Sequence, residues 1–89
     1  MQALLLKARR GSEPPQAVLA CVARGSATEA EALALGELHR AGWQVLEVVP
    51  SEEVRRRMPG LKRLPLAAAT MASARTRGMA LAVIELPED

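Results

Sequence analysis

Hydrophobic and polar positions alternate along the chain in blocks that predict strands and helices in a definite order. An apolar run at residues 17–23 is followed by a helical pattern over residues 27–41, and then by a second apolar run at residues 45–49. Short apolar runs bounded by turn residues are typical of strands, whereas apolar positions recurring every three or four residues are typical of helices. Residues 17–50 therefore predict a strand–helix–strand unit that ends at Pro50.

The N-terminal segment predicts a further strand. Residues 1–9 are mostly apolar, and residues 11–15 read Gly-Ser-Glu-Pro-Pro, a composition typical of turns. We therefore expect residues 1–9 and 16–24 to form an antiparallel hairpin. Both runs are apolar at consecutive positions, which is typical of strands whose two faces are both shielded from water.

The helix at residues 27–41 has clear start and stop signals. Ser26 with Glu29, or Thr28 with Glu31, predicts a capping box at its N-terminus. One apolar stripe then recurs at helical spacing, formed by Ala27, Ala30, Ala34, Leu38 and Ala41. Leu33 and Leu35 lie on its flanks.

Gly42 predicts the end of this helix, because glycine readily adopts the left-handed conformation of a helix terminus. Trp43 would then pack back on Leu38, so we expect a structural role for the tryptophan.

The second half of the chain predicts one short turn, one helix and one strand. Residues 52–57 are expected to form a short helical turn that Pro59 and Gly60 break. Pro65 suits the first turn of a helix from Leu66 to Arg77, and Gly78 is its predicted stop. The final strand is predicted at residues 79–86.

The order β-β-α-β-α-β in one domain, residues 1–89, predicts an α/β (α+β plait) fold. Strand–helix–strand crossovers give parallel strands, so we expect a four-stranded mixed sheet with two helices on one face, ferredoxin-like or a close variant. The other face would then be apolar and uncovered, which predicts contact between subunits.

Composition strengthens the expectation of self-association. The chain is 49% hydrophobic, but aromatic residues make up 1% and Trp43 is their sole representative. Aromatic side chains normally bury about 150–250 Å² each, so an alanine-lined core is thin. We therefore expect a homo-oligomer, with a dimer favoured.

Charge is strongly segregated along the sequence. Residues 11–53 carry seven acids, whereas residues 54–84 carry seven basic residues and no acid. These candidate anion- or partner-binding residues are Arg55, Arg56, Arg57, Lys62, Arg63, Arg75 and Arg77. Three interpretations stay open: a solvated basic surface, a nucleic-acid site, or a site for an acidic protein or the acidic residues 29–53 of another subunit. The sequence lacks aromatic platforms for stacking bases.

No constellation predicts catalysis, a metal or a cofactor. His39 and Cys21 are the single histidine and cysteine, so ligand pairs at metal spacing are missing. The serines lack a nucleophile-elbow pattern, and the adjacent acids at 29/31, 52/53 and 88/89 suit helix starts or solvation better than acid–base work. The turn Arg24-Gly25-Ser26 precedes a helix N-terminus and is a weak anion candidate. We do not expect an enzyme.

The single cysteine also bears on the cellular compartment in which the protein is expected. Cys21 lies in an apolar run and predicts a buried, inert thiol, and one cysteine cannot form an intramolecular disulfide. The N-terminal apolar stretch is too short for a signal peptide or a membrane span. We therefore expect a cytoplasmic protein with no membrane partner.

These observations predict a small non-enzymatic α/β interaction or regulatory module that self-associates. The alternative is a nucleic-acid-associated protein that uses the basic segment 54–77.

Overall fold

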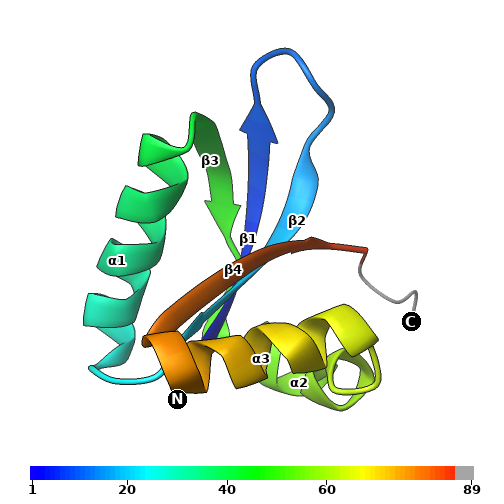
Figure 1. Cartoon of the computed structure of the whole chain (residues 1–89). Helices are drawn as coiled ribbons and strands as arrows, with labels where there is room; N and C mark the ends of the chain where they lie inside the picture. Colours follow the sequence, from blue (N-terminus) through cyan, green and yellow to red (C-terminus); the bar gives the residue numbers. More distant parts are fainter. Residues whose placement is uncertain (86–89) are drawn as a thin grey trace.

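The computed structural model describes residues 1–85 and contains four strands and three helices within them (Figure 1). In chain order the elements are β1 (Gln2–Arg10), β2 (Gln16–Val22), α1 (Ala27–Arg40), β3 (Trp43–Val48), α2 (Ser51–Leu61), α3 (Pro65–Arg77) and β4 (Met79–Ile84). The α+β class, the hairpin and all four strands are as the sequence predicts.

The sheet is antiparallel throughout, which corrects the expected mixed sheet. Its strand order is β3-β1-β2-β4, and β1 pairs antiparallel with both β2 and β3, as β2 does with β4. The crossover through α1 does leave β2 and β3 pointing the same way. They are not neighbours, however, because β1 fills the position between them.

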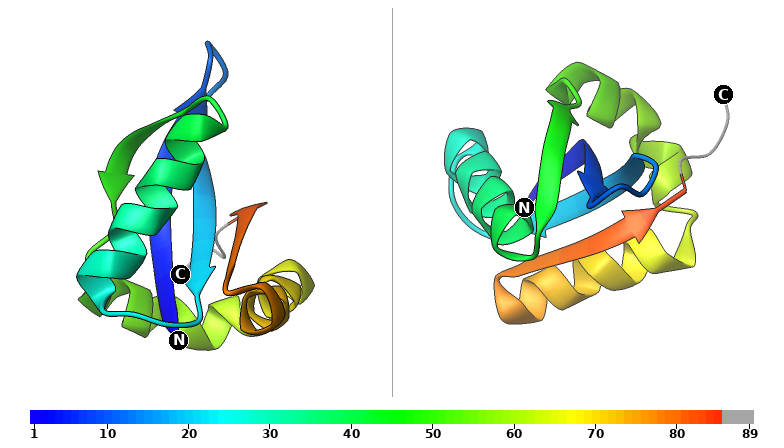
Figure 2. Two further views of the ribbon diagram at one scale, coloured as in Figure 1. Left: turned by 60° about the vertical axis from the view of Figure 1, so that its left-hand side comes forward. Right: turned by 90° about the horizontal axis from the view of Figure 1, so that it is seen from above.

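The helices lie on both faces of the sheet, which corrects the expectation of two helices on one face. Helix α1 packs over β3, β1 and β2, whereas α3 packs over β4 and β2 on the other side, with α2 against β1 (Figure 2). The consecutive residues Leu5 and Leu6 of β1 show the reason, because each is buried in a different cluster. An apolar strand that alternates its side chains between two faces requires cover on both.

Each face of the sheet has its own core. The cluster under α2 and α3 consists of Leu5, Leu19, Cys21, Val54, Leu61, Ala67, Ala74 and Ile84. The cluster under α1 consists of Leu6, Ala8, Val18, Ala20, Ala34 and Leu38. Alanine supplies much of the second cluster, which lets α1 lie close to the sheet.

The start of α1 confirms one of the two predicted capping boxes. The backbone N–H of Glu29 donates to Ser26 Oγ at 3.2 Å, and the N–H of Ser26 donates to Glu29 Oε1 at 3.3 Å. Along the helix, Ala30, Ala34 and Leu38 are buried as predicted, but Ala27 and Ala41 are exposed. The two exposed alanines lie at the two ends of the helix, Ala27 at its first position and Ala41 at the C-cap.

The end of α1 follows the sequence. Gly42 has φ +87°, and its N–H donates to the carbonyl of His39 at 3.0 Å. Trp43 begins β3 and packs on the cluster that contains Leu38, and the Arg10 guanidinium lies 5.2 Å from the centroid of its ring. The tryptophan is therefore a structural anchor, as predicted.

Helix α2 corrects the prediction of a short turn at 52–57 broken by Pro59 and Gly60. The helix runs through both residues to Leu61, and the N–H of Lys62 still donates to the carbonyl of Met58 at 2.9 Å. An interior proline costs about 3 kcal/mol in an isolated helix. Burial of Val54 and Leu61 against the sheet offsets that cost.

Helix α3 and β4 are close to expectation. Pro65 lies in the first turn, and Gly78 ends the helix with φ +93°. Strand β4 ends at Ile84, two residues before the predicted end. Leu86, the last residue of the predicted strand, and the acids Glu88 and Asp89 lie outside the described residues.

Candidate functional site

The seven candidate basic residues lie at three separate places on the surface. Arg55, Arg56 and Arg57 belong to α2, Lys62 and Arg63 to the turn between α2 and α3, and Arg75 and Arg77 to the last turn of α3. The thirteen residues of α3 span about 20 Å at 1.5 Å per residue. The sequence block therefore does not fold into one compact cluster within a single chain.

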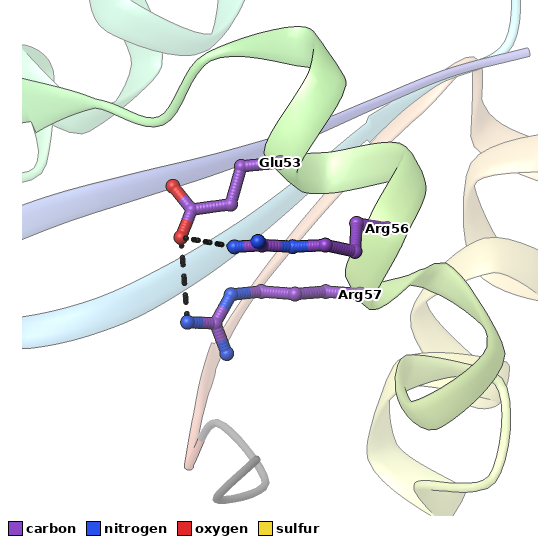
Figure 3. A network of polar contacts seen from close by, with 3 residues as sticks. All are labelled: Glu53, Arg56 and Arg57. Carbon is purple, nitrogen blue, oxygen red and sulfur yellow. Dashed lines mark hydrogen bonds and ion pairs between the residues drawn. The ribbon is translucent and has the colours of Figure 1, made fainter.

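Two of the α2 arginines converge on one carboxylate. The Nη2 atoms of Arg56 and Arg57 each lie 3.4 Å from Glu53 Oε1 (Figure 3). These are pairs at helical spacing of the kind that contributes little on a solvated surface. Their effect here is to neutralise part of the basic segment with an acid from the same helix.

The remaining cations of the segment have no such partner. Within residues 1–85, no ion pair involves Arg55, Lys62, Arg63, Arg75 or Arg77, and all five are exposed. Arg24 lies near the end of α3, because the N–H of Ala23 donates to the carbonyl of Gly78 at 2.8 Å. Arg24 is therefore a third exposed arginine at the C-terminal end of α3, and it lies outside the basic segment 54–77.

A cleft of about 310 Å³ lies between α2, β1, the start of β2 and the end of β3. Its apolar lining includes Leu5 and Val49, and its charged lining is Lys7, Glu47, Glu53 and Arg57. Its two positive and two negative side chains include the paired Arg57 and Glu53. The open part of this sheet face is polar, because Lys7 faces Glu47 and Arg9 faces Gln44.

The groups that could carry chemistry are isolated. Cys21 is fully buried in the α2/α3 cluster, and burial raises the pKa of its thiol above the usual value of 9.0. His39 is exposed on α1. Within residues 1–85, no group of three or more metal-ligating side chains lies together, and no helix there is long and apolar enough to cross a membrane.

The weak anion candidate at Arg24-Gly25-Ser26 is filled from within the chain. Gly25 has φ +98°, and the Glu29 side chain lies against it while accepting from the Ser26 N–H. A carboxylate therefore already occupies the N-terminus of α1, where an external anion would bind.

Four apolar residues of α1 and β4 are exposed or half-buried, and we name them together the α1–β4 surface: Leu33, Met79, Leu81 and Val83. Thr28 and Glu31 line a cavity with Val48, so that flank of α1 faces β3. Leu33 lies on the opposite flank of α1, away from β3. Leu33 is 50% exposed and Val83 40%, while Met79 and Leu81 are half-buried.

Within residues 1–85, the outer edge of β4 carries unpaired backbone groups. The Ala23–Gly78 bond and the β2–β4 register make Ala80 and Ala82 the residues that bond to β2. The N–H and C=O groups of Met79, Leu81 and Val83 then point away from the sheet. A second bond agrees with this assignment, because the Val49 N–H donates to the Leu5 carbonyl and the backbone groups of Leu5 therefore point toward β3. Leu19, which lies opposite Leu5 on β2, then bonds to Ala82 of β4.

The two edges of the sheet differ in character. Strand β3 carries Gln44 and Glu47 and has a register shift opposite Lys7 and Ala8, where Leu46 is 42% exposed. Charged residues and bulges are the devices that discourage an edge from pairing with another strand. Strand β4 reads Met-Ala-Leu-Ala-Val-Ile, with no charge, proline or register shift.

Sequence reasoning missed this edge because strand order was not available from it. The available signal was the uncharged run at residues 79–84, but such a run is equally typical of a central strand.

Comparisons of the chain with models of known protein families, with curated proteins and with solved structures found no match in any of the three.

Proposed function

We propose that this protein is a small non-enzymatic interaction or regulatory module that works as a homodimer. The observation that carries the proposal is the uncharged outer edge of β4, together with exposed apolar side chains on β4 and α1. Strand β4 has unpaired backbone groups and no charged residue, and the α1–β4 surface leaves Leu33 and Val83 largely exposed.

Both features are unfavourable in a monomer. Contiguous exposed apolar side chains mark interaction sites on soluble proteins, and an uncharged edge strand is a template for another strand. A chain of 89 residues also buries a modest core of its own. Because it has one cysteine, we place the module in the cytoplasm, where disulfides are rare.

Size-exclusion chromatography with light scattering between about 1 and 100 µM tests self-association. The expected mass is twice the chain mass of 9.5 kDa at the upper concentrations. A mass that stays at that of one chain across the whole range would overturn the proposal. The variant Leu46→Lys, which changes an exposed residue of the opposite edge, serves as the control and should keep the dimer mass.

Nucleic-acid binding through residues 54–77 is the second candidate. It is favoured by the five cations of this segment that have no ion pair within residues 1–85. Phosphate contacts release counterions, so such binding weakens steeply with salt.

Fluorescence anisotropy with short DNA and RNA duplexes and single strands, at two salt concentrations, measures this binding. We expect the double variant Lys62→Ala/Arg63→Ala to weaken it, and Arg40→Ala to leave it unchanged, since Arg40 pairs with Glu37 on α1. Absence of binding at low salt removes this candidate.

A further inference from the structure

We propose that a second copy of this chain pairs with β4 in antiparallel orientation, so that two four-stranded sheets join into one sheet of eight strands. The inference rests on the proposed self-association and names the surface and the register that carry it. Strand β4 is an outer strand with β2 as its sole neighbour in the sheet (Figures 1 and 2).

The backbone of β4 limits the register to a small choice. The free N–H and C=O groups belong to Met79, Leu81 and Val83, as derived from the bond between Ala23 and Gly78. In an antiparallel pair, directly opposed residues either exchange both bonds or neither. A two-fold axis must therefore set these odd-numbered residues against each other.

One register uses all of these groups. When Leu81 faces Leu81 of the partner subunit, Met79 faces the partner's Val83, and each chain pairs three free N–H and three free C=O groups. Centring the axis on Ala82 instead would leave Met79 to pair beyond the end of β4 at Ile84. The geometry therefore points to the Leu81-centred register.

The side chains are compatible with this register. Leu81 meets its own counterpart, and Met79 meets Val83, on the α1 face of the sheet, where Leu81 also packs against the cluster under α1. On the other face the small residues Ala80 and Ala82 oppose each other. Pairing two β4 strands opposes no like charges, because β4 has no charged residue. Strand β3 carries Glu47, so two paired β3 strands would bring like charges onto the same interface.

The same axis brings two α3 helices side by side on the opposite face. Because the helices run antiparallel, Lys62 and Arg63 of one copy lie near Arg75 and Arg77 of the partner subunit. The dimer thus gathers cations that one chain keeps about 20 Å apart, and their repulsion weakens association at low salt.

Disulfide cross-linking of single-cysteine additions tests the pairing. Residues that face each other across antiparallel strands have Cα atoms about 4.5–5.5 Å apart, within the range of about 4.4–6.8 Å that a disulfide needs. Two Val83 residues would be offset by four residues, about 13 Å along the strands. Wild-type protein is the blank, because its Cys21 is buried.

We expect mild oxidation to convert most of Leu81→Cys to a covalent dimer, at least tenfold more than Val83→Cys or Leu46→Cys on the opposite edge. Light scattering on each reduced variant establishes that the dimer is intact before oxidation. As a second measurement, Val83→Arg should raise the dimer dissociation constant at least tenfold, and Leu46→Arg should leave it unchanged.

The outcomes separate this inference from the proposed function. A wild-type dimer in which Leu81→Cys does not cross-link, or in which Leu46→Cys cross-links as well, overturns the β4 pairing and leaves self-association standing. A monomer at all concentrations overturns both, as expected if β4 instead accepts a strand from another protein.

Discussion

Leu5 and Leu6 are adjacent in sequence, and each is 1% exposed, yet they belong to different cores. Consecutive apolar positions predicted that both faces of β1 are shielded from water. They could not predict what shields each face, because that depends on where α1, α2 and α3 pack after the sheet has formed. The residue pattern therefore predicted correctly that both faces of β1 are buried, but it predicted wrongly what covers them.

Truncating either leucine should be costly. We expect Leu5→Ala and Leu6→Ala each to lower the free energy of unfolding by about 2–5 kcal/mol, the usual range for a buried leucine. Urea denaturation followed by circular dichroism measures it. Leu46→Ala, at an exposed position, should change stability by less than about 0.5 kcal/mol. A small effect at one of the two buried positions would mean that its face of the sheet is open.

Cys21 supports a prediction about pH. Its thiol has a raised pKa in the folded chain because burial disfavours the thiolate. The unfolded chain therefore releases this proton first, so the contribution to stability is complete below pH 9 and declines as pH rises above the ordinary thiol pKa of 9.0. Wild-type protein should lose stability relative to Cys21→Ala between about pH 9 and 11.

Chemical denaturation of both proteins at several pH values gives this difference. A gap between them that stays constant from pH 8 to 11 would contradict a buried thiol. Thiol-reactive dye should likewise label native protein at pH 8 slowly and unfolded protein fast.

At the scale of elements, the helix ends were predicted correctly, because they depend on residues close together in the sequence. The cap of α1, its stop at Gly42 and the stop of α3 at Gly78 all follow from residues within a few positions of each other. Helix α2 differs, because Pro59 and Gly60 oppose it locally and Val54 and Leu61 stabilise it through contacts with the sheet. Such contacts cannot be predicted before the strand order is known.

The choice between the two capping boxes of α1 can be tested directly. The hydrogen bonds belong to Ser26, so Ser26→Ala should lower the free energy of unfolding by about 1 kcal/mol. Thr28→Ala is the matched control and should cost less than about 0.5 kcal/mol, since Thr28 is exposed. Thermal or urea unfolding of the two variants ranks them, and the reverse order would contradict the observed cap.

At the scale of the whole molecule, the spatial arrangement of the candidate basic residues could not be predicted from their order in the sequence. The basic residues are adjacent in sequence, but α3 separates them by its own length, and Glu53 pairs with two of them. The uncharged edge of β4 was not predicted, because the position of β4 at the edge of the sheet depends on the strand order. Self-association, expected from composition, now has a specific surface to be tested.

Salt gives one test at this scale. Because the proposed dimer brings Lys62 and Arg63 near Arg75 and Arg77 of the partner subunit, screening should strengthen it. We expect the dissociation constant to fall when sodium chloride rises from about 20 to 200 mM, as measured by sedimentation equilibrium. An increase over that range would place opposite charges, not like charges, at the interface.

Amide hydrogen exchange followed by NMR tests the pairing of β4 most directly. In an isolated chain the N–H groups of Met79, Leu81 and Val83 face away from the sheet and should exchange fast, while those of Ala80 and Ala82 are protected by β2. We predict that at high protein concentration all five are protected, and that Met79, Leu81 and Val83 lose protection on dilution. Fast exchange at these three residues at every concentration would contradict the account.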